Sequence, residues 1–372
     1  MKYCENCFDD GNLQEYIEQK GTKSNSFTCN NCGTINSEYL LEDYALSSWI
    51  KGIIYKVYSY EDGMAYTVSK TYIEDDENIT DYAPFRDLYS VCGDLFSCEQ
   101  DDIIRIINNE TSQYAIMKDG GEDYFLDPYS QCWVKECWFD HSPRHLNWNN
   151  FSENVKHSLR FFNNKDFNRE DELEKLSILF DYLGIYKLSE HQCYRVRGVT
   201  LDKISTVQDD PEKELGSAPH DKSKHNRFSP SGISYVYLAF DQETAYKEVL
   251  DDAESLNYFS SCWKLDTDLN LLDLRKDRFE EISSVYTNPF SNKYDSYVEC
   301  GEEFLMKFIH KIQKSISEYD KVLEYIPTQV LAEYIRLKGY DGFVFNSSKN
   351  KDGINIVLFD KSNLKFVEYE KV

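Results

Sequence analysis

Four cysteines near the start of the chain have the spacing of a metal site. Cys4 and Cys7 form one C-x2-C pair, Cys29 and Cys32 form a second, and 21 residues separate the two pairs. Each pair can place two sulfur atoms about 2.3 Å from one ion, and two pairs complete a tetrahedron. The spacing therefore predicts a structural Zn²⁺ site, with a four-cysteine iron–sulfur centre as the weaker alternative. Because such a site has no open coordination position, we expect no chemistry there.

A second group of metal-type residues lies further along the chain and consists of Cys132, Cys137, His141 and His145. Turns could gather these four side chains around a second ion. Each of the two cysteines stands directly before a tryptophan, however, which is typical of thiols packed in a core. Core packing is therefore the simpler interpretation of this group.

The C-terminal half holds residue types suited to a nucleotide diphosphate and a sugar. Arg195 and Arg227 could bind a diphosphate through paired guanidinium hydrogen bonds. Glu248 could stabilise the positive charge that grows on a sugar as its glycosidic bond breaks, and Tyr237 could stack on a flat heterocycle. Ser347 and Asn355 follow in the same half. Taken singly, each position also suits an ordinary exposed side chain. Glu248, for example, lies off the apolar stripe of its helix, as a solvent-facing carboxylate would.

The elements that must position these residues change in character near residue 185. Before this point apolar residues recur at helical spacing, and after it short strands interleave with helices without a regular βαβ spacing. This pattern predicts an α+β protein. We expect helices over 40–58, 85–96, 101–110, 151–164, 170–184, 302–316 and 327–339, and a helix over 242–252 that Asp241 can cap. We expect strands over 194–201 and 234–240, one or two strands over 262–274, buried strands over 341–348 and 354–360, and a loop over 208–232.

Composition limits the classes of function. The 372 residues suggest about two domains, and 41% hydrophobic with 15% aromatic residues is too apolar for a disordered chain. The net charge of −25 argues against binding nucleic acid through a broad basic surface. No apolar run approaches the roughly 20 residues of a membrane span, and the first residues lack a secretory signal. Eleven cysteines, four of them in C-x2-C pairs, indicate reduced thiols, so we expect a cytoplasmic protein.

Beyond these patterns, the C-terminal half resembles the RES domain, a family with an ADP-ribosyltransferase-like fold that includes bacterial toxins of toxin–antitoxin pairs. The resemblance rests on YRVRG at 194–198, RFSPSG at 227–232, YVYLAFDQETAYKE at 235–248 and the segment 326–359. It implies cleavage of NAD⁺ at the nicotinamide–ribose bond by hydrolysis or phosphorolysis, in a toxin or defence effector. ADP-ribosyl transfer to a protein or nucleic acid, and a non-catalytic nucleotide sensor, are the alternatives.

The same resemblance implies roles for single residues. Arg195 and Arg227 would hold the diphosphate and the nearby ribose, and Tyr237 would position the nicotinamide side. Glu248 would serve the transition state, and a serine would complete the pocket. Ser347 is our choice for that serine, although Ser348 is adjacent to it. NAD⁺ would be the substrate, and Zn²⁺ would be the only other bound group that we expect.

The N-terminal part resembles the HEPN-like domain that precedes RES domains in some bacterial proteins, on its cysteine pairs and the segment 148–162. None of the seven histidines has an arginine at the upstream distance of the HEPN ribonuclease motif, which argues for a regulatory or partner-binding role. We therefore expect inhibition by this domain or by an antitoxin, and a homo-oligomer is a further option. The expected domains are a zinc ribbon over 1–38, a helical HEPN-like domain over 39–185 and a RES domain over 190–365.

Overall fold

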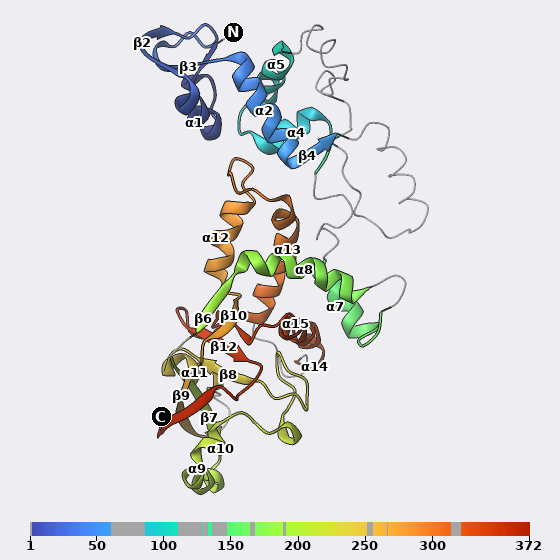
Figure 1. Cartoon of the computed structure of the whole chain (residues 1–372), viewed down its shortest axis with the longest axis vertical. Coiled ribbons are helices and arrows are strands. Elements are labelled where there is room, and N and C mark those ends of the chain that lie inside the picture. Colours follow the sequence, from blue (N-terminus) through green and yellow to red (C-terminus); the bar gives the residue numbers. More distant parts are fainter. Residues whose placement is uncertain are drawn as a thin grey trace. The chain divides into compact units, whose positions relative to one another are not determined.

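The computed structural model describes residues 2–60, 86–110, 129, 133–135, 147–163, 168–188, 191–250, 256–265, 267–313 and 321–372. The chain divides into two compact units. Unit 1 consists of residues 1–140 and 286–296, and unit 2 consists of residues 141–285 and 297–372. Figure 1 labels the elements of both units.

Unit 1 combines a small sheet with a group of helices (Figure 1). Its elements are β1 (Lys2–Cys4), the 3-10 turn η1 (Glu5–Cys7), α1 (Gly11–Lys20), β2 (Thr22–Thr28), β3 (Ile35–Glu42), α2 (Asp43–Val57), β4 (Tyr58–Tyr60), α4 (Leu88–Leu95), α5 (Gln100–Glu110) and β5 (Trp133–Lys135). The antiparallel sheet has the order β1-β3-β2, and β4 pairs with β5. The apolar face of α2, with Leu46, Ile50 and Ile54 fully buried, packs against α4 and α5.

The segment 286–296 completes the core of unit 1. The Phe290 ring stacks on Trp49 of α2 with 5.8 Å between ring centroids, and it packs edge-on against Phe96 at the same separation. The Lys56 ammonium donates to the Pro289 carbonyl over 2.9 Å and lies over the Tyr294 ring. A segment that follows helix α12 (Lys276–Tyr286) in the sequence is therefore part of the N-terminal unit.

Unit 2 is built on one large mixed sheet (Figure 1). Its strands are β6 (Ile185–Leu188), β7 (Gln192–Val199), β8 (Val236–Ala239), β9 (Asn257–Leu265), β10 (Leu269–Asp273), β11 (Gly342–Asn346), β12 (Ile354–Leu358) and β13 (Leu364–Lys371). The strand order is β13-β9-β7-β8-β12-β11-β10-β6, in which β10 and β11 are parallel and the other neighbours are antiparallel.

Unit 2 also contains helices. They are α7 (Trp148–His157), α8 (Arg169–Leu183), η4 (Leu201–Lys203), α9 (Ile204–Asp209), α10 (Pro211–Leu215), η5 (His220–Lys222), α11 (Gln242–Val249), α12 (Lys276–Tyr286), α13 (Ser296–Gln313), α14 (Lys321–Glu324) and α15 (Ile326–Leu337). Trp148 of α7 packs on Phe304 and Phe308 of α13, with ring centroids 5.5 and 5.8 Å apart. Helices α7 and α8, which the sequence assigns to the helical N-terminal domain, thus belong to the second compact unit.

The observed architecture confirms a helical N-terminal region, a cysteine cluster and a mixed C-terminal sheet. Three local predictions were wrong. The helix expected over 151–164 ends at His157, because Ser158 adopts a non-helical backbone conformation (φ −113°, ψ −94°). Residues 40–42 belong to β3, because Leu40 and Leu41 pair with Cys4 and Tyr3 of β1, and helix α2 begins only at Asp43. The expected loop over 208–232 contains α10 and η5, since the Asp210 side chain caps α10 and Pro211 fits its first turn.

Within the ranges that the structure describes, no helix combines the length and the apolar character that crossing a membrane requires.

Candidate active site and metal centre

Glu248 occupies the last turn of the short helix α11. The Asp241 carboxylate caps this helix by accepting from the Thr244 backbone N–H over 2.7 Å. Ala245 packs against Val196 and Ala239 and so holds α11 on one face of the sheet. The cap and this packing leave Glu248 half-buried at the edge of that contact.

Two side chains from distant parts of the sequence hold the Glu248 carboxylate. The Ser347 hydroxyl, just beyond β11, donates to Glu248 Oε1 over 2.6 Å, and the Asn355 amide of β12 donates to the same oxygen over 2.7 Å. Ser347 and Asn355 are each 8% exposed, whereas the adjacent Ser348 is exposed. Of the two neighbouring serines, Ser347 is therefore the one in contact with Glu248.

The turn after Ser347 is fastened to helix α11. The Asn350 amide donates to the Thr244 hydroxyl over 2.6 Å, and the Lys349 ammonium donates to the Glu248 backbone carbonyl over 2.9 Å. A Cβ atom at Gly353 would lie 2.4 Å from the Thr244 Oγ1 atom, so only glycine lets the two segments approach this closely. The geometry around Glu248 is thus fixed from two sides.

Tyr237 lies on β8, two positions before Ala239, and residues two apart on a strand face the same side of the sheet. Because Ala239 packs with Ala245 of α11, Tyr237 lies on the face that α11 covers. Its hydroxyl is 3.1 Å from the buried Ser229 hydroxyl, and its ring stacks on Phe228. Burial raises the pKa of Tyr237 to about 12. The phenol is therefore neutral at physiological pH and can donate a hydrogen bond.

Arg227 is held by contacts with Ile312 of α13 and with Tyr325, the residue before α15. Its guanidinium donates to the Ile312 carbonyl and lies over the Tyr325 ring, 5.8 Å from the ring centroid. Its own carbonyl accepts from the Thr328 hydroxyl. The positive charge of Arg227 also acts on Tyr237, whose pKa it lowers against the larger effect of burial.

Arg195 points away from α11. Its neighbours Tyr194 and Val196 belong to the cluster beneath that helix, so alternation along β7 directs Arg195 to the opposite face of the strand. There its guanidinium donates to the Gly216 carbonyl at the end of α10. Burial, and next the charge of Arg197, lower the pKa of Arg195 to about 10, an effect that Tyr237 partly offsets.

The predicted site residues therefore fall into distinct groups. Glu248 and Ser347 are in direct contact, and Tyr237 lies on the same face of the sheet, within electrostatic range of Arg227. Arg195 lies on the neighbouring strand with its side chain directed to the other face, although Tyr237 still acts on it electrostatically. The contacts of Asn355 and Ser229 with these residues were not anticipated from the sequence, because each depends on strand register, which no short motif encodes.

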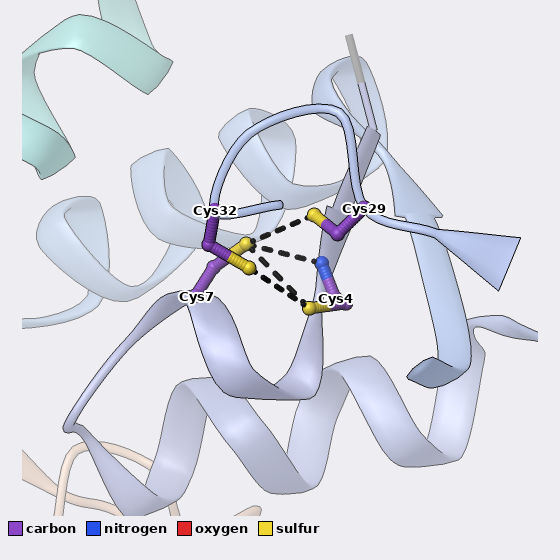
Figure 2. A group of neighbouring side chains, drawn as sticks. All are labelled: Cys4, Cys7, Cys29 and Cys32. Atoms are coloured by element: carbon purple, nitrogen blue, oxygen red, sulfur yellow. Dashed lines mark hydrogen bonds between the residues drawn. The ribbon is translucent and has the colours of Figure 1, made fainter. Parts of the chain in front are cut away.

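Cys4, Cys7, Cys29 and Cys32 form the candidate metal centre in unit 1. Figure 2 shows the four side chains pointing toward one another, Cys4 from the end of β1, Cys7 from the η1 turn, and Cys29 and Cys32 from the loop between β2 and β3. Their sulfur atoms all lie within 4.8 Å of one another, and three of the separations are 3.8, 3.5 and 3.4 Å. Four sulfurs about 2.3 Å from a tetrahedral zinc ion lie about 3.8 Å apart, so the cluster fits such an ion.

Polar groups also surround these sulfurs. The Asn31 amide donates to Cys7 Sγ over 3.5 Å, and the Cys4 backbone N–H approaches the same sulfur at 3.3 Å. Such donors offset the negative charge of metal-bound thiolates. The other group that the sequence singled out, Cys132, Cys137, His141 and His145, lies outside the described residues.

Comparison with known protein families matches residues 192–372 to the family described as the RES domain. Comparison with curated proteins found no match. Among solved structures, the crystal structure of the M. tuberculosis MbcT–MbcA toxin–antitoxin complex is similar at 15% sequence identity. That match covers 54% of this chain and 92% of the other, with a TM-score of 0.31, which is too low to establish a common fold.

Proposed function

Residues 192–372 are a RES domain, and on this basis we propose that the chain is a toxin-like enzyme that cleaves NAD⁺ at its nicotinamide–ribose bond. The observation that carries the proposal is the Glu248 carboxylate, held by Ser347 and Asn355. We further propose that residues 192–372 have the ADP-ribosyltransferase-like fold of the RES family.

The proposed reaction breaks the bond between ribose C1′ and the nicotinamide nitrogen. Nicotinamide leaves with the bonding electron pair as a neutral molecule, and positive charge develops on the ribose. Water then attacks C1′ and releases one proton, so that NAD⁺ and water give nicotinamide, ADP-ribose and H⁺. An ionised Glu248 stabilises the sugar cation more strongly than it stabilises the bound substrate, which is the requirement for catalysis.

We assign the remaining residues to substrate binding. Tyr237, with a neutral hydroxyl and a ring beside Phe228, would contact the nicotinamide side of NAD⁺. Arg227 and Arg195 would hold the diphosphate and the nearby ribose. For Arg195 this requires its guanidinium to leave the Gly216 carbonyl or to bind substrate from its present side of β7.

The fate of a label on the adenine of NAD⁺ tests this proposal. We expect the purified chain to convert labelled NAD⁺ to free ADP-ribose, or to its 1″-phosphate when phosphate is the acceptor, together with one nicotinamide. Label that becomes attached to a protein or nucleic acid would indicate transfer instead. NAD⁺ that binds and stays intact would contradict an enzymatic role and favour a nucleotide sensor.

We propose that the four-cysteine cluster holds one structural Zn²⁺ ion, since its sulfur separations suit a tetrahedral ion. Four thiolate ligands leave no open position, so the ion would stabilise the fold of unit 1 and take no part in NAD⁺ cleavage.

We propose that the protein is cytoplasmic. Because an enzyme that consumes NAD⁺ endangers the cell that makes it, we also propose that it is restrained by residues 1–140 or by an antitoxin-like partner. The resemblance of the predicted domain 39–185 to HEPN-like domains remains a prediction. Removing residues 1–140 keeps α7 and α8 of unit 2 and is expected to increase toxicity on expression. Toxicity equal to that of the full chain would contradict restraint by this region.

A further inference from the structure

We propose that Asn355 is a positioning residue which, together with Ser347, fixes Glu248 through its Oε1 atom and leaves Oε2 as the oxygen that faces the substrate. The inference rests on the proposed function, because it concerns the same carboxylate. Its evidence is the arrangement of donors around that one side chain.

The proton of Ser347 can point in only one direction. A hydroxyl has one hydrogen to donate and two lone pairs that accept. In Ser347 the oxygen accepts from the backbone N–H groups of Lys349 over 3.1 Å and Asn350 over 3.0 Å. With both lone pairs engaged, the hydrogen is left for Glu248 Oε1, 2.6 Å away. Ser347 is therefore a fixed donor to the carboxylate.

Asn355 supplies the second donor from a rigid element. It lies in β12, paired with Ala239 of β8, and strand pairing on both sides of β12 fixes its backbone. The register places Asn355 on the face that α11 covers, directly across from the helix that carries Glu248. Its amide donates to Oε1 over 2.7 Å, so both donors converge on one atom.

The turn between Ser347 and Gly353 is hydrogen-bonded to α11 and so holds Ser347 and Asn355 in place beside Glu248. The Thr244 hydroxyl donates to Asp241 over 2.7 Å and accepts from Asn350 over 2.6 Å, which links the helix cap to the turn. The Gly353 N–H donates to the Asn350 carbonyl, and the Ser347 N–H donates to the Gly353 carbonyl over 2.8 Å. This frame reaches Glu248 without any contribution from a ligand.

The second carboxylate oxygen has a different environment. Among the described residues, no hydrogen-bond donor contacts Glu248 Oε2, and the side chain as a whole is half-buried rather than enclosed. A carboxylate with two donors on one oxygen cannot turn without losing both of them. Oε2 is thus held in one direction with its lone pairs available to the ribose, and Asn355 acts on the reaction only through Glu248.

The test compares kinetic constants for NAD⁺ cleavage. Asn355→Ala and Asn355→Leu both remove the amide donor, and Asn355→Leu also keeps the side-chain volume. If only one of the two variants folds, that variant alone still measures the loss of the donor. We expect kcat to fall about 10- to 100-fold, the effect of losing one hydrogen bond to a charged group, while KM changes less than about twofold. Ser347→Ala should behave in the same way, and Ser348→Ala, which alters an exposed hydroxyl, should match the wild type.

A double-mutant comparison separates positioning from a structural role. In the Glu248→Gln background, Asn355→Ala should lower the residual rate less than about twofold, because the group through which it acts is already gone. An equal further loss in that background, or a wild-type kcat in the folded single variants, would overturn the positioning role and leave the proposed function intact. A wild-type chain that releases no nicotinamide would overturn both.

Discussion

Replacing Glu248 with Gln is expected to lower the rate of nicotinamide release from NAD⁺ by about 10²–10³-fold in the purified protein, the usual effect of removing one group that stabilises transition-state charge. Gln has the shape of Glu and its amide oxygen can still accept from Ser347 and Asn355, so the local fold should persist. What the variant lacks is the negative charge beside the developing ribose cation. Initial rates at saturating NAD⁺ measure the effect.

Helix α11 offers a matched control. Glu243 also lies on α11, forms an ion pair with Lys247 over 2.6 Å, and has a side chain 70% exposed. Glu243→Gln removes the same charge from the same helix, and an exposed pair of this kind contributes little to stability. We expect it to keep wild-type turnover. Equal rates for Glu248→Gln and the wild type would end the catalytic assignment of Glu248.

Removal of metal from the four-cysteine cluster is expected to unfold the sheet formed by β1, β2 and β3. Zinc contributes on the order of 10 kcal/mol to the folding of small zinc-dependent peptides, an amount comparable to the net stability of a whole domain, about 5–15 kcal/mol. The purified chain should contain one zinc per molecule. Chelation, or Cys7→Ser, should expose residues 2–42 to proteases while the sheet of unit 2 stays intact.

A thiol outside the cluster serves as the control for that experiment. Cys98 is half-buried in unit 1, apart from the four clustered sulfurs, so Cys98→Ser should retain the metal and the protease resistance. Protein that contains no metal and yet resists proteolysis within residues 2–42 would contradict a structural ion at this position.

The sequence was most informative where the chemistry is local. Two cysteines three positions apart can bind one ion whatever the rest of the fold, so the two pairs alone indicated the cluster. Helix α11 likewise follows from a capping Asp241 and a short amphipathic run. The contacts of Glu248 are different, because Asn355 meets it only through the register of β12 with β8, and register is set by the whole sheet.

Strand alternation also limited what could be predicted for the arginines. The sequence shows that Arg195 and Arg197 share one face of β7, but not which face lies toward Glu248. The observed direction depends on α11 covering Val196 on one side and α10 meeting Arg195 on the other. In the same way, the helical pattern of α7 was evident, whereas its packing with α13 depends on contacts between residues far apart in the sequence, such as Trp148 and Phe304.

The level of NAD⁺ in cells that express the full chain tests the central claim most directly. We predict that cellular NAD⁺ falls after induction of the wild type under conditions that relieve its restraint, and stays at the uninduced level with Glu248→Gln expressed to the same amount. Depletion that is equal for both proteins, or NAD⁺ that remains constant while the wild type is toxic, would contradict cleavage of NAD⁺ by the Glu248 site.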